Sequence, residues 1–194
     1  MERKTMSTKT MVLGALLTAL VLALQFMGAT IKLGPFSVSL VLIPIVIGAV
    51  TCGKTIGAWL GFVFGFAVLL SGDAAPFMAV NIPGTIITVL VKGTLCGFVA
   101  GLIYQGLRKI IKNDYFSAVI AALVCPIVNT GVFLIGCKLF FMSQITKWAG
   151  GTDVGKYMIL VLVGGNFLFE MAVNIIFAPV IVQLLKIVNK GKRL

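Results

Sequence analysis

Histidine is absent from this chain of 194 residues, and acidic side chains are scarce, with 5 Asp and Glu against 16 Lys and Arg. The missing histidine removes the commonest general base of enzymes and the commonest metal ligand of proteins. The sequence also has no Gly-x-Ser-x-Gly motif and no pair of carboxylates inside its apolar stretches, which leaves few groups for catalysis. We therefore expect neither an enzyme nor a metal site.

Charged residues are missing from long stretches of the chain. The sequence is 60% hydrophobic and 11% charged, and its mean hydropathy of +1.14 is far above that of soluble domains. A membrane-spanning helix needs about 20 apolar residues, and the apolar runs here are continuous rather than alternating, which favours helices. The sequence predicts one all-α, polytopic membrane domain over 1–194, with six helices at about 9–28, 38–52, 55–71, 83–107, 115–141 and 155–187.

Basic residues gather between the predicted helices and indicate the orientation of the chain. With six spans, one side holds Arg3, Lys4, Lys9, Lys54, Arg108, Lys109, Lys112, Lys186, Lys190, Lys192 and Arg193, and the other holds Lys32, Lys147 and Lys156. Since positive charge marks cytoplasmic loops, we expect both termini in the cytoplasm. The net charge of +11 is dispersed in this way rather than gathered in one patch, so it does not indicate a nucleic acid partner.

A few polar residues interrupt the last three predicted helices, and polar groups inside a membrane indicate functional sites by default. Asn166, Glu170 and Asn174 are spaced i, i+4, i+8 and therefore share one face of their helix. Most of the polar groups fall in the halves of these helices that face away from the cytoplasm. The expected substrate-binding residues are Asn81, Thr88, Lys92, Asn129, Lys138, Asn166, Glu170 and Asn174.

Two interpretations of these residues remain open. Lys92 and Glu170 can pair and hold two helices together, with Asn and Thr adding interhelical hydrogen bonds of about 0.6 kcal/mol each. Alternatively, the residues line a pocket that opens to the outside and binds a small polar solute. Lysine suits a carboxylate or phosphate in such a pocket, although Lys138 can instead extend to the membrane surface. Outer aromatic residues suit a ring or an alkyl chain; they include Phe36, Phe77 and Trp148.

Small residues follow one side of the first predicted helix. Ala15, Ala19 and Ala23 recur every four residues. Small residues let a second helix approach closely, because helix association in lipid depends on packing. We expect this face to contact a partner protein.

Together these features resemble the substrate-binding (S) components of energy-coupling factor (ECF) transporters, small six-helix membrane proteins that capture vitamins. The Ala15-x-x-x-Ala19 pattern is similar to that family's contact with its coupling partner. Similarity to the riboflavin- and pantothenate-type members extends over LVLIPIVIGAVTCGKTIGAWLGFVFGF (40–66) and NIPGTIITVLVKGTLCGFVAGLIY (81–104). The chain differs at Gly53-Lys54, where many relatives carry Gly-Pro, and at residues 38–41, which lack the charges of riboflavin-type members.

The resemblance implies a pocket between the helices 83–107, 115–141 and 155–187, covered by the loop after the first helix. It implies that this chain needs no cofactor, because a transmembrane coupling protein and two ATPase subunits bind ATP while the chain tilts to carry its ligand inward. The expected function is capture of a water-soluble vitamin or related micronutrient at a prokaryotic plasma membrane, surrounded by lipid. A stand-alone small-solute transporter or channel is the first alternative, and a structural membrane subunit is the second.

Overall fold

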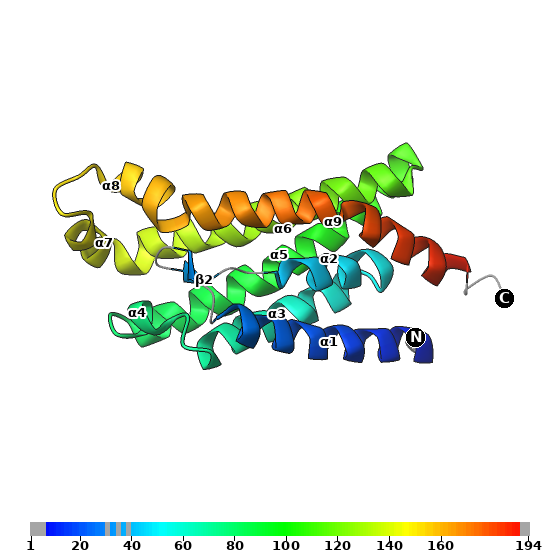
Figure 1. The fold of residues 1–194 in the computed structure, drawn as a ribbon, viewed down its shortest axis with the longest axis horizontal. Coiled ribbons are helices and arrows are strands. Elements are labelled where there is room, and N and C mark those ends of the chain that lie inside the picture. Colours follow the sequence, from blue (N-terminus) through cyan, green and yellow to red (C-terminus); the bar gives the residue numbers. More distant parts are fainter. Residues whose placement is uncertain (1–6, 30–31, 34–35, 38–39, 191–194) are drawn as a thin grey trace, which may run out of the picture.

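The computed structural model describes residues 7–29, 32–33, 36–37 and 40–190. Helices make up nearly all of this part of the chain (Figure 1). In chain order they are α1 (Thr8–Gly28), α2 (Leu42–Thr51), α3 (Lys54–Leu70), α4 (Ala75–Met78), α5 (Ile82–Ile111), α6 (Asp114–Gly136), the π-helix η1 (Cys137–Phe141), α7 (Met142–Ala149), α8 (Val154–Lys156), the π-helix η2 (Tyr157–Gly164) and α9 (Gly165–Lys190). The two-residue strands β1 (Lys32–Leu33) and β2 (Phe36–Ser37) pair antiparallel between α1 and α2.

Side-chain caps explain where three of these helices begin. Ser7, Asn81 and Asn113 each accept a hydrogen bond from a backbone N–H in the first turn of α1, α5 and α6. Such caps satisfy donors that a helix start leaves without a partner. Pro83 in the first turn of α5 removes one further donor there. The turn between α5 and α6 is short, with Lys112 in the left-handed conformation at φ 55° and Asn113 capping α6.

The helices differ from the predicted ones in three places. Residues 142–149, expected in a loop, form α7, because Ile145 and Ala149 are one turn apart and both buried. Residues 75–78, also expected in a loop, form the short helix α4. The second helix begins at Leu42 rather than at 38, and residues 38 and 39 lie outside the described part of the chain.

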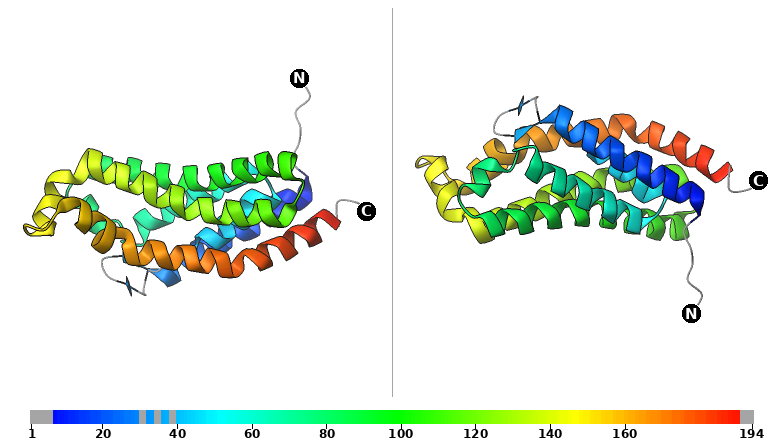
Figure 2. Two further views of the ribbon diagram at one scale, coloured as in Figure 1. Left: turned by 90° about the horizontal axis from the view of Figure 1, so that it is seen from above. Right: turned by 90° about the horizontal axis from the view of Figure 1, so that it is seen from below.

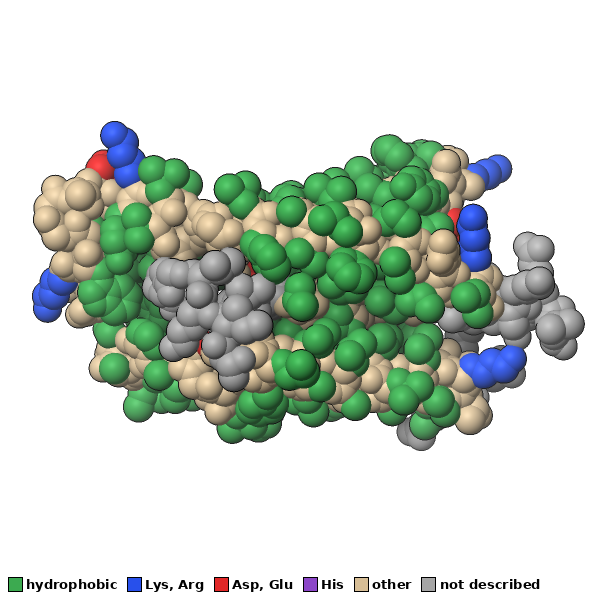
Figure 3. Space-filling model, in the orientation of Figure 1, with side chains coloured by type: hydrophobic (Ala, Val, Ile, Leu, Met, Phe, Trp, Pro, Cys, Tyr) green, Lys and Arg blue, Asp and Glu red, His purple; other side chains and the backbone are tan. Residues whose placement is uncertain are grey.

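The long helices run roughly along the longest axis of the molecule (Figures 1 and 2). Both termini lie at one end, which we call the terminal end, and α4, α7 and α8 lie at the other, which we call the α4 end. On the face shown in Figure 3, hydrophobic side chains cover the middle of the molecule, while Lys and Arg side chains stand at its two ends. This distribution suits a protein whose middle is surrounded by lipid.

Length and composition of the helices lead to the same conclusion. Within the described residues, four helical stretches are long and apolar enough to cross a membrane: Thr8–Gly28, Ile82–Ile111, Asp114–Ala149 and Val154–Ile187. Two apolar helices, α2 and α3, are shorter. A helix satisfies all its backbone groups internally, as hydrocarbon requires. The helical fold class predicted from the sequence is therefore confirmed.

Helices α3 and α5 lie closer together than side chains would allow. Gly57 and Gly61 of α3 face Gly97 and Gly93 of α5, and a β-carbon added to any of the four would collide with the carbonyl oxygen of the glycine opposite. Four-residue spacing puts the glycines of each helix on one face. Because lipid gives apolar helices little reason to associate, such close backbone packing is a main source of their stability.

The turn between α2 and α3 contains a sequence motif whose role depends on the structure around it. Residues 48–55 read GAVTCGKT and match the G-x-x-x-x-G-K-[ST] pattern of phosphate-binding loops. Such a loop leaves a β-strand and offers free backbone N–H groups to phosphates. Here residues 48–51 are the last turn of α2, and α3 begins at Lys54. The N–H of Cys52 donates to the carbonyl of Gly48 at 2.9 Å, so the segment is a tight helix–helix turn.

Gly93→Ala is expected to destabilise the protein by roughly 1–3 kcal/mol, because the new methyl group would collide with the backbone of Gly61. Gly106→Ala is the matched control, since Gly106 also lies in α5 and an added β-carbon there has nothing within 4 Å. Alanine should stabilise that helix position by up to about 1 kcal/mol. Thermal unfolding in detergent measures both, and a Gly93→Ala variant as stable as the parent would contradict the close contact.

Candidate functional site

A cavity with two adjoining lobes lies between the helices. The first lobe measures about 500 Å³, its open mouth included, and the second about 320 Å³. Lys92, Asn129, Phe133 and Asn166 line both lobes. The first lobe is also lined by Gln25, Phe64, Val68, Asp73, Ala74, Phe77 and Glu170, and the second by Thr130, Leu162 and Val163. Four of the substrate-binding residues expected from the sequence thus come together in one place.

Glu170 is the centre of a buried polar cluster in the first lobe. Its side chain is 1% exposed, and its Oε1 accepts a hydrogen bond of 3.0 Å from Nδ2 of Asn166, one turn earlier on α9. The other carboxylate oxygen of Glu170 has no hydrogen-bond partner in the described part of the protein, and neither has Oδ1 of Asn129 or Asn166. A buried acceptor without a donor costs about 1–3 kcal/mol. The cavity wall therefore holds three acceptors that a ligand could satisfy.

Lys92 supplies the positive charge of the cavity. Its Nζ lies 5.2 Å from the ring centroid of Phe133 and 5.7 Å from that of Phe64, within the range of a cation–π interaction. Across the residues that the structure describes, Lys92 forms no ion pair with Glu170 or another carboxylate. The pairing interpretation of Lys92 and Glu170 is therefore not realised as a direct contact, although both residues line the first lobe.

Aromatic rings close the α4 end of the cavity. Phe77 of α4 packs edge-on against three rings, with centroid distances of 5.4 Å to Phe133, 5.0 Å to Phe141 and 5.5 Å to Trp148. Phe77 itself lines the first lobe, whereas Trp148 supports it from α7. The side chain of Phe36, the third aromatic residue expected near a ligand, lies outside the described part of the protein.

Sequence reasoning missed two polar residues of the first lobe, Gln25 and Asp73. Gln25 is 3% exposed on α1. Its Nε2 donates to Oδ2 of Asp73 at 2.6 Å and to Oγ of Ser71 at 3.2 Å. The hydrogen bonds tie the end of α1 to the turn between α3 and α4. A lone glutamine in an otherwise apolar helix was the available signal.

The other four residues expected at the site lie outside both lobes. Thr88 is buried between α5 and α6. Asn174 donates to the backbone carbonyl of Glu170 at 2.8 Å. Asn81 caps α5, and Lys138 is exposed on η1. These positions give Asn81 and Asn174 local structural roles.

Helix α1 has two different faces. Leu17, Val21 and Gln25 are buried against the bundle. Ala15, Ala19 and Ala23, which the sequence predicted to contact a partner, are exposed. The small-residue face is thus available on the surface of the described structure.

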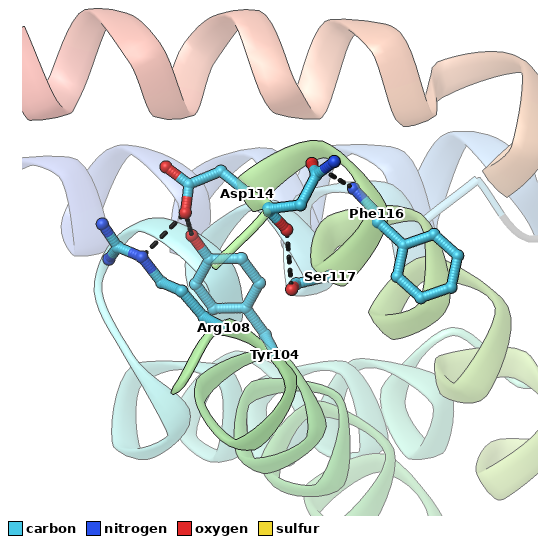
Figure 4. A network of polar contacts seen from close by, with 6 residues as sticks. Tyr104, Arg108, Asp114, Phe116 and Ser117 are labelled. Atoms are coloured by element: carbon cyan, nitrogen blue, oxygen red, sulfur yellow. Dashed lines mark hydrogen bonds and ion pairs between the residues drawn. The ribbon is translucent and has the colours of Figure 1, made fainter. Parts of the chain in front are cut away.

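A separate polar network lies at the terminal end, where α5 meets α6 (Figure 4). Nε of Arg108 pairs with Oδ1 of Asp114 at 2.7 Å, and the hydroxyl of Tyr104 donates to the same oxygen at 3.5 Å. These residues line neither lobe of the cavity. The network therefore stabilises the α5–α6 turn and is not part of the candidate site.

Comparison with known proteins identifies the family. A family model described as "ECF transporter, substrate-specific component" matches residues 9–182. The chain belongs to this family. As an ECF substrate-specific component with several apolar helices, it is a multi-pass protein of the plasma membrane that serves transport.

A curated relative of this ECF component is the pantothenic acid transporter PanT of Lactococcus lactis subsp. cremoris (strain MG1363). The two chains are 25% identical over 199 residues, which cover 94% of this chain and 96% of the relative. No solved structure matches the chain significantly. The family is one of transporter components and not of enzymes.

Lys92→Met and Glu170→Gln are each expected to destabilise this ECF component by less than the loss of a direct ion pair would, because the two side chains form no ion pair in the described structure. Breaking a buried ion pair would instead destabilise the fold by about 3–5 kcal/mol. Thermal unfolding of both single variants and of the double variant distinguishes the cases. Large losses in the singles that the double variant recovers would establish direct pairing.

Proposed function

We propose that this ECF component captures pantothenate or a closely related water-soluble vitamin. A relative named for pantothenic acid aligns with nearly the whole chain. The cavity supports this substrate through a lysine for a carboxylate, buried acceptors for hydroxyl and amide groups, and aromatic walls. The observation that carries the proposal is that Lys92 and the Glu170 cluster line one cavity without pairing with each other.

The proposed topology has six spans with both termini in the cytoplasm. At or near the terminal end of the molecule, α3 carries Lys54 and α5 carries Arg108 and Lys109. The opposite end carries Lys147 in α7 and Lys156 in α8. The positive-inside rule then places the α4 end outside the cell. In that orientation Phe77 and Asp73, which line the first lobe, mark its extracellular side.

The proposed partners are a transmembrane coupling protein and two ATPase subunits, which supply the ATP binding for uptake. The exposed face of Ala15, Ala19 and Ala23 supports a contact with the coupling protein, because small residues let helices pack closely. Membrane lipid covers the remaining apolar surface.

Isothermal titration of the purified protein with pantothenate tests the proposed substrate, and mass spectrometry identifies any ligand that stays bound through purification. Lys92→Met is expected to weaken pantothenate binding by roughly 10- to 100-fold, because it removes a charge-assisted hydrogen bond. Lys156→Met is the matched control, since Lys156 is exposed and lines neither lobe. A protein that retains another vitamin and does not bind pantothenate would refute this substrate.

Ala19→Trp is expected to reduce uptake into cells that also produce the coupling protein and the ATPases, since the indole keeps a second helix from close approach. Binding of pantothenate to the isolated variant should stay unchanged. Leu102→Trp on the exposed side of α5 is the control for a bulky residue in lipid. If Ala19→Trp lost binding in isolation as well, this face would be internal packing.

A further inference from the structure

The cavity wall contains two kinds of polar group that a ligand could bind, a cation and several hydrogen-bond acceptors. The cation and the acceptors lie on different helices. Nζ of Lys92 on α5 is a cation whose close contacts are the rings of Phe64 and Phe133. The unused acceptors are Oε2 of Glu170 and Oδ1 of Asn166 on α9 and Oδ1 of Asn129 on α6. Each of these side chains lines the first lobe. A ligand that used all of them would need an anionic group and several hydrogen-bond donors.

The charges of the first lobe restrict that ligand further. Its described lining contains one cation, Lys92, and two carboxylates, Glu170 and Asp73. A carboxylate oxygen attracts donors and repels a second anion, and the repulsion is strong where water is excluded. The carboxylate of Glu170 is almost completely buried. An additional negative charge on the ligand would therefore be rejected beside Glu170.

We propose that the site is selective for a ligand with a single anionic group, held at Lys92, and an uncharged end that donates hydrogen bonds to Glu170, Asn129 and Asn166. Vitamins phosphorylated at the donor end are excluded, so the transporter takes up the unphosphorylated form. The inference deepens the proposed function and rests on it. It adds which end of the substrate lies at Lys92, and why a ligand with a second anionic group is rejected.

Three probes test the orientation by titration: pantothenate, pantothenol, whose primary alcohol replaces the carboxylate, and 4′-phosphopantothenate, which carries a phosphate at the hydroxyl end. The parent protein is expected to bind pantothenate roughly 10- to 100-fold more tightly than pantothenol, because only the carboxylate forms a charge-assisted contact with Lys92. No binding of the phosphorylated probe is expected at the same concentrations.

Three variants then show which end of the ligand lies at Lys92 and which lies at Glu170. In Lys92→Met the preference for pantothenate over pantothenol should disappear, and Lys92→Gln, which retains a polar side chain, should behave in the same way. In Glu170→Gln both probes should bind more weakly by a similar factor, so the preference remains. Lys156→Met, an exposed lysine outside both lobes, should leave the preference as in the parent. Thermal unfolding of each variant confirms that it is folded.

The outcomes separate this inference from the proposed function. If the parent binds pantothenate and Lys92→Met keeps the preference over pantothenol, the orientation is wrong and the substrate stands. A larger preference for pantothenate in Glu170→Gln than in the parent would show instead that the carboxylate lies beside Glu170, where the substitution removes a repelling charge, and that the ligand lies the other way round. Tight binding of 4′-phosphopantothenate would overturn the exclusion of a second anion. If the parent binds none of the three probes, the proposed substrate falls and the orientation with it.

Discussion

The backbone contact between α3 and α5 is the constraint on which the candidate site depends. Gly61 and Gly93 touch through their main chains. Lys92 precedes Gly93 directly, and Phe64 lies one turn beyond Gly61, so the same contact brings the ammonium group of Lys92 over the Phe64 ring. A side chain at either glycine would move the helices apart and separate the two groups. In lipid, where burial gives little drive for association, shape complementarity of this kind has to position a polar site.

Helical periodicity predicted several residues that line the candidate cavity, and the limits of this prediction have a physical cause. The spacing of Asn166, Glu170 and Asn174 correctly placed them on one side of a helix, because every fourth residue returns to the same face. The structure nevertheless divides them. Asn166 and Glu170 line the cavity, whereas Asn174 bonds to the backbone of its own helix. Periodicity shows which residues share one face of a helix, but it does not show which neighbouring helix packs against that face.

Contacts between distant segments were beyond sequence reasoning for a related reason. Gln25 and Asp73 are 48 residues apart, and their hydrogen bond exists because the chain returns to the end of α1 after α3. Residues 142–149 were expected to be a loop, because the burial of Ile145 and Ala149 and the packing of Trp148 against Phe77 arise only in the folded structure. The glycines of α3 and α5 are likewise spaced four residues apart in the sequence, but the spacing alone does not show that the two helices contact each other through them.

The two faces of α1 join the candidate cavity to the proposed docking face. Gln25 is bound to Asp73 in the cavity wall, while Ala23, two residues earlier, is exposed on the proposed docking face. A helix transmits a displacement along its length because every turn is hydrogen-bonded to the next. A ligand that changed the Gln25–Asp73 contact would therefore act on the helix that carries the proposed docking face. One helix thus belongs both to the cavity wall and to the proposed docking face, so α1 is the element through which the two are joined.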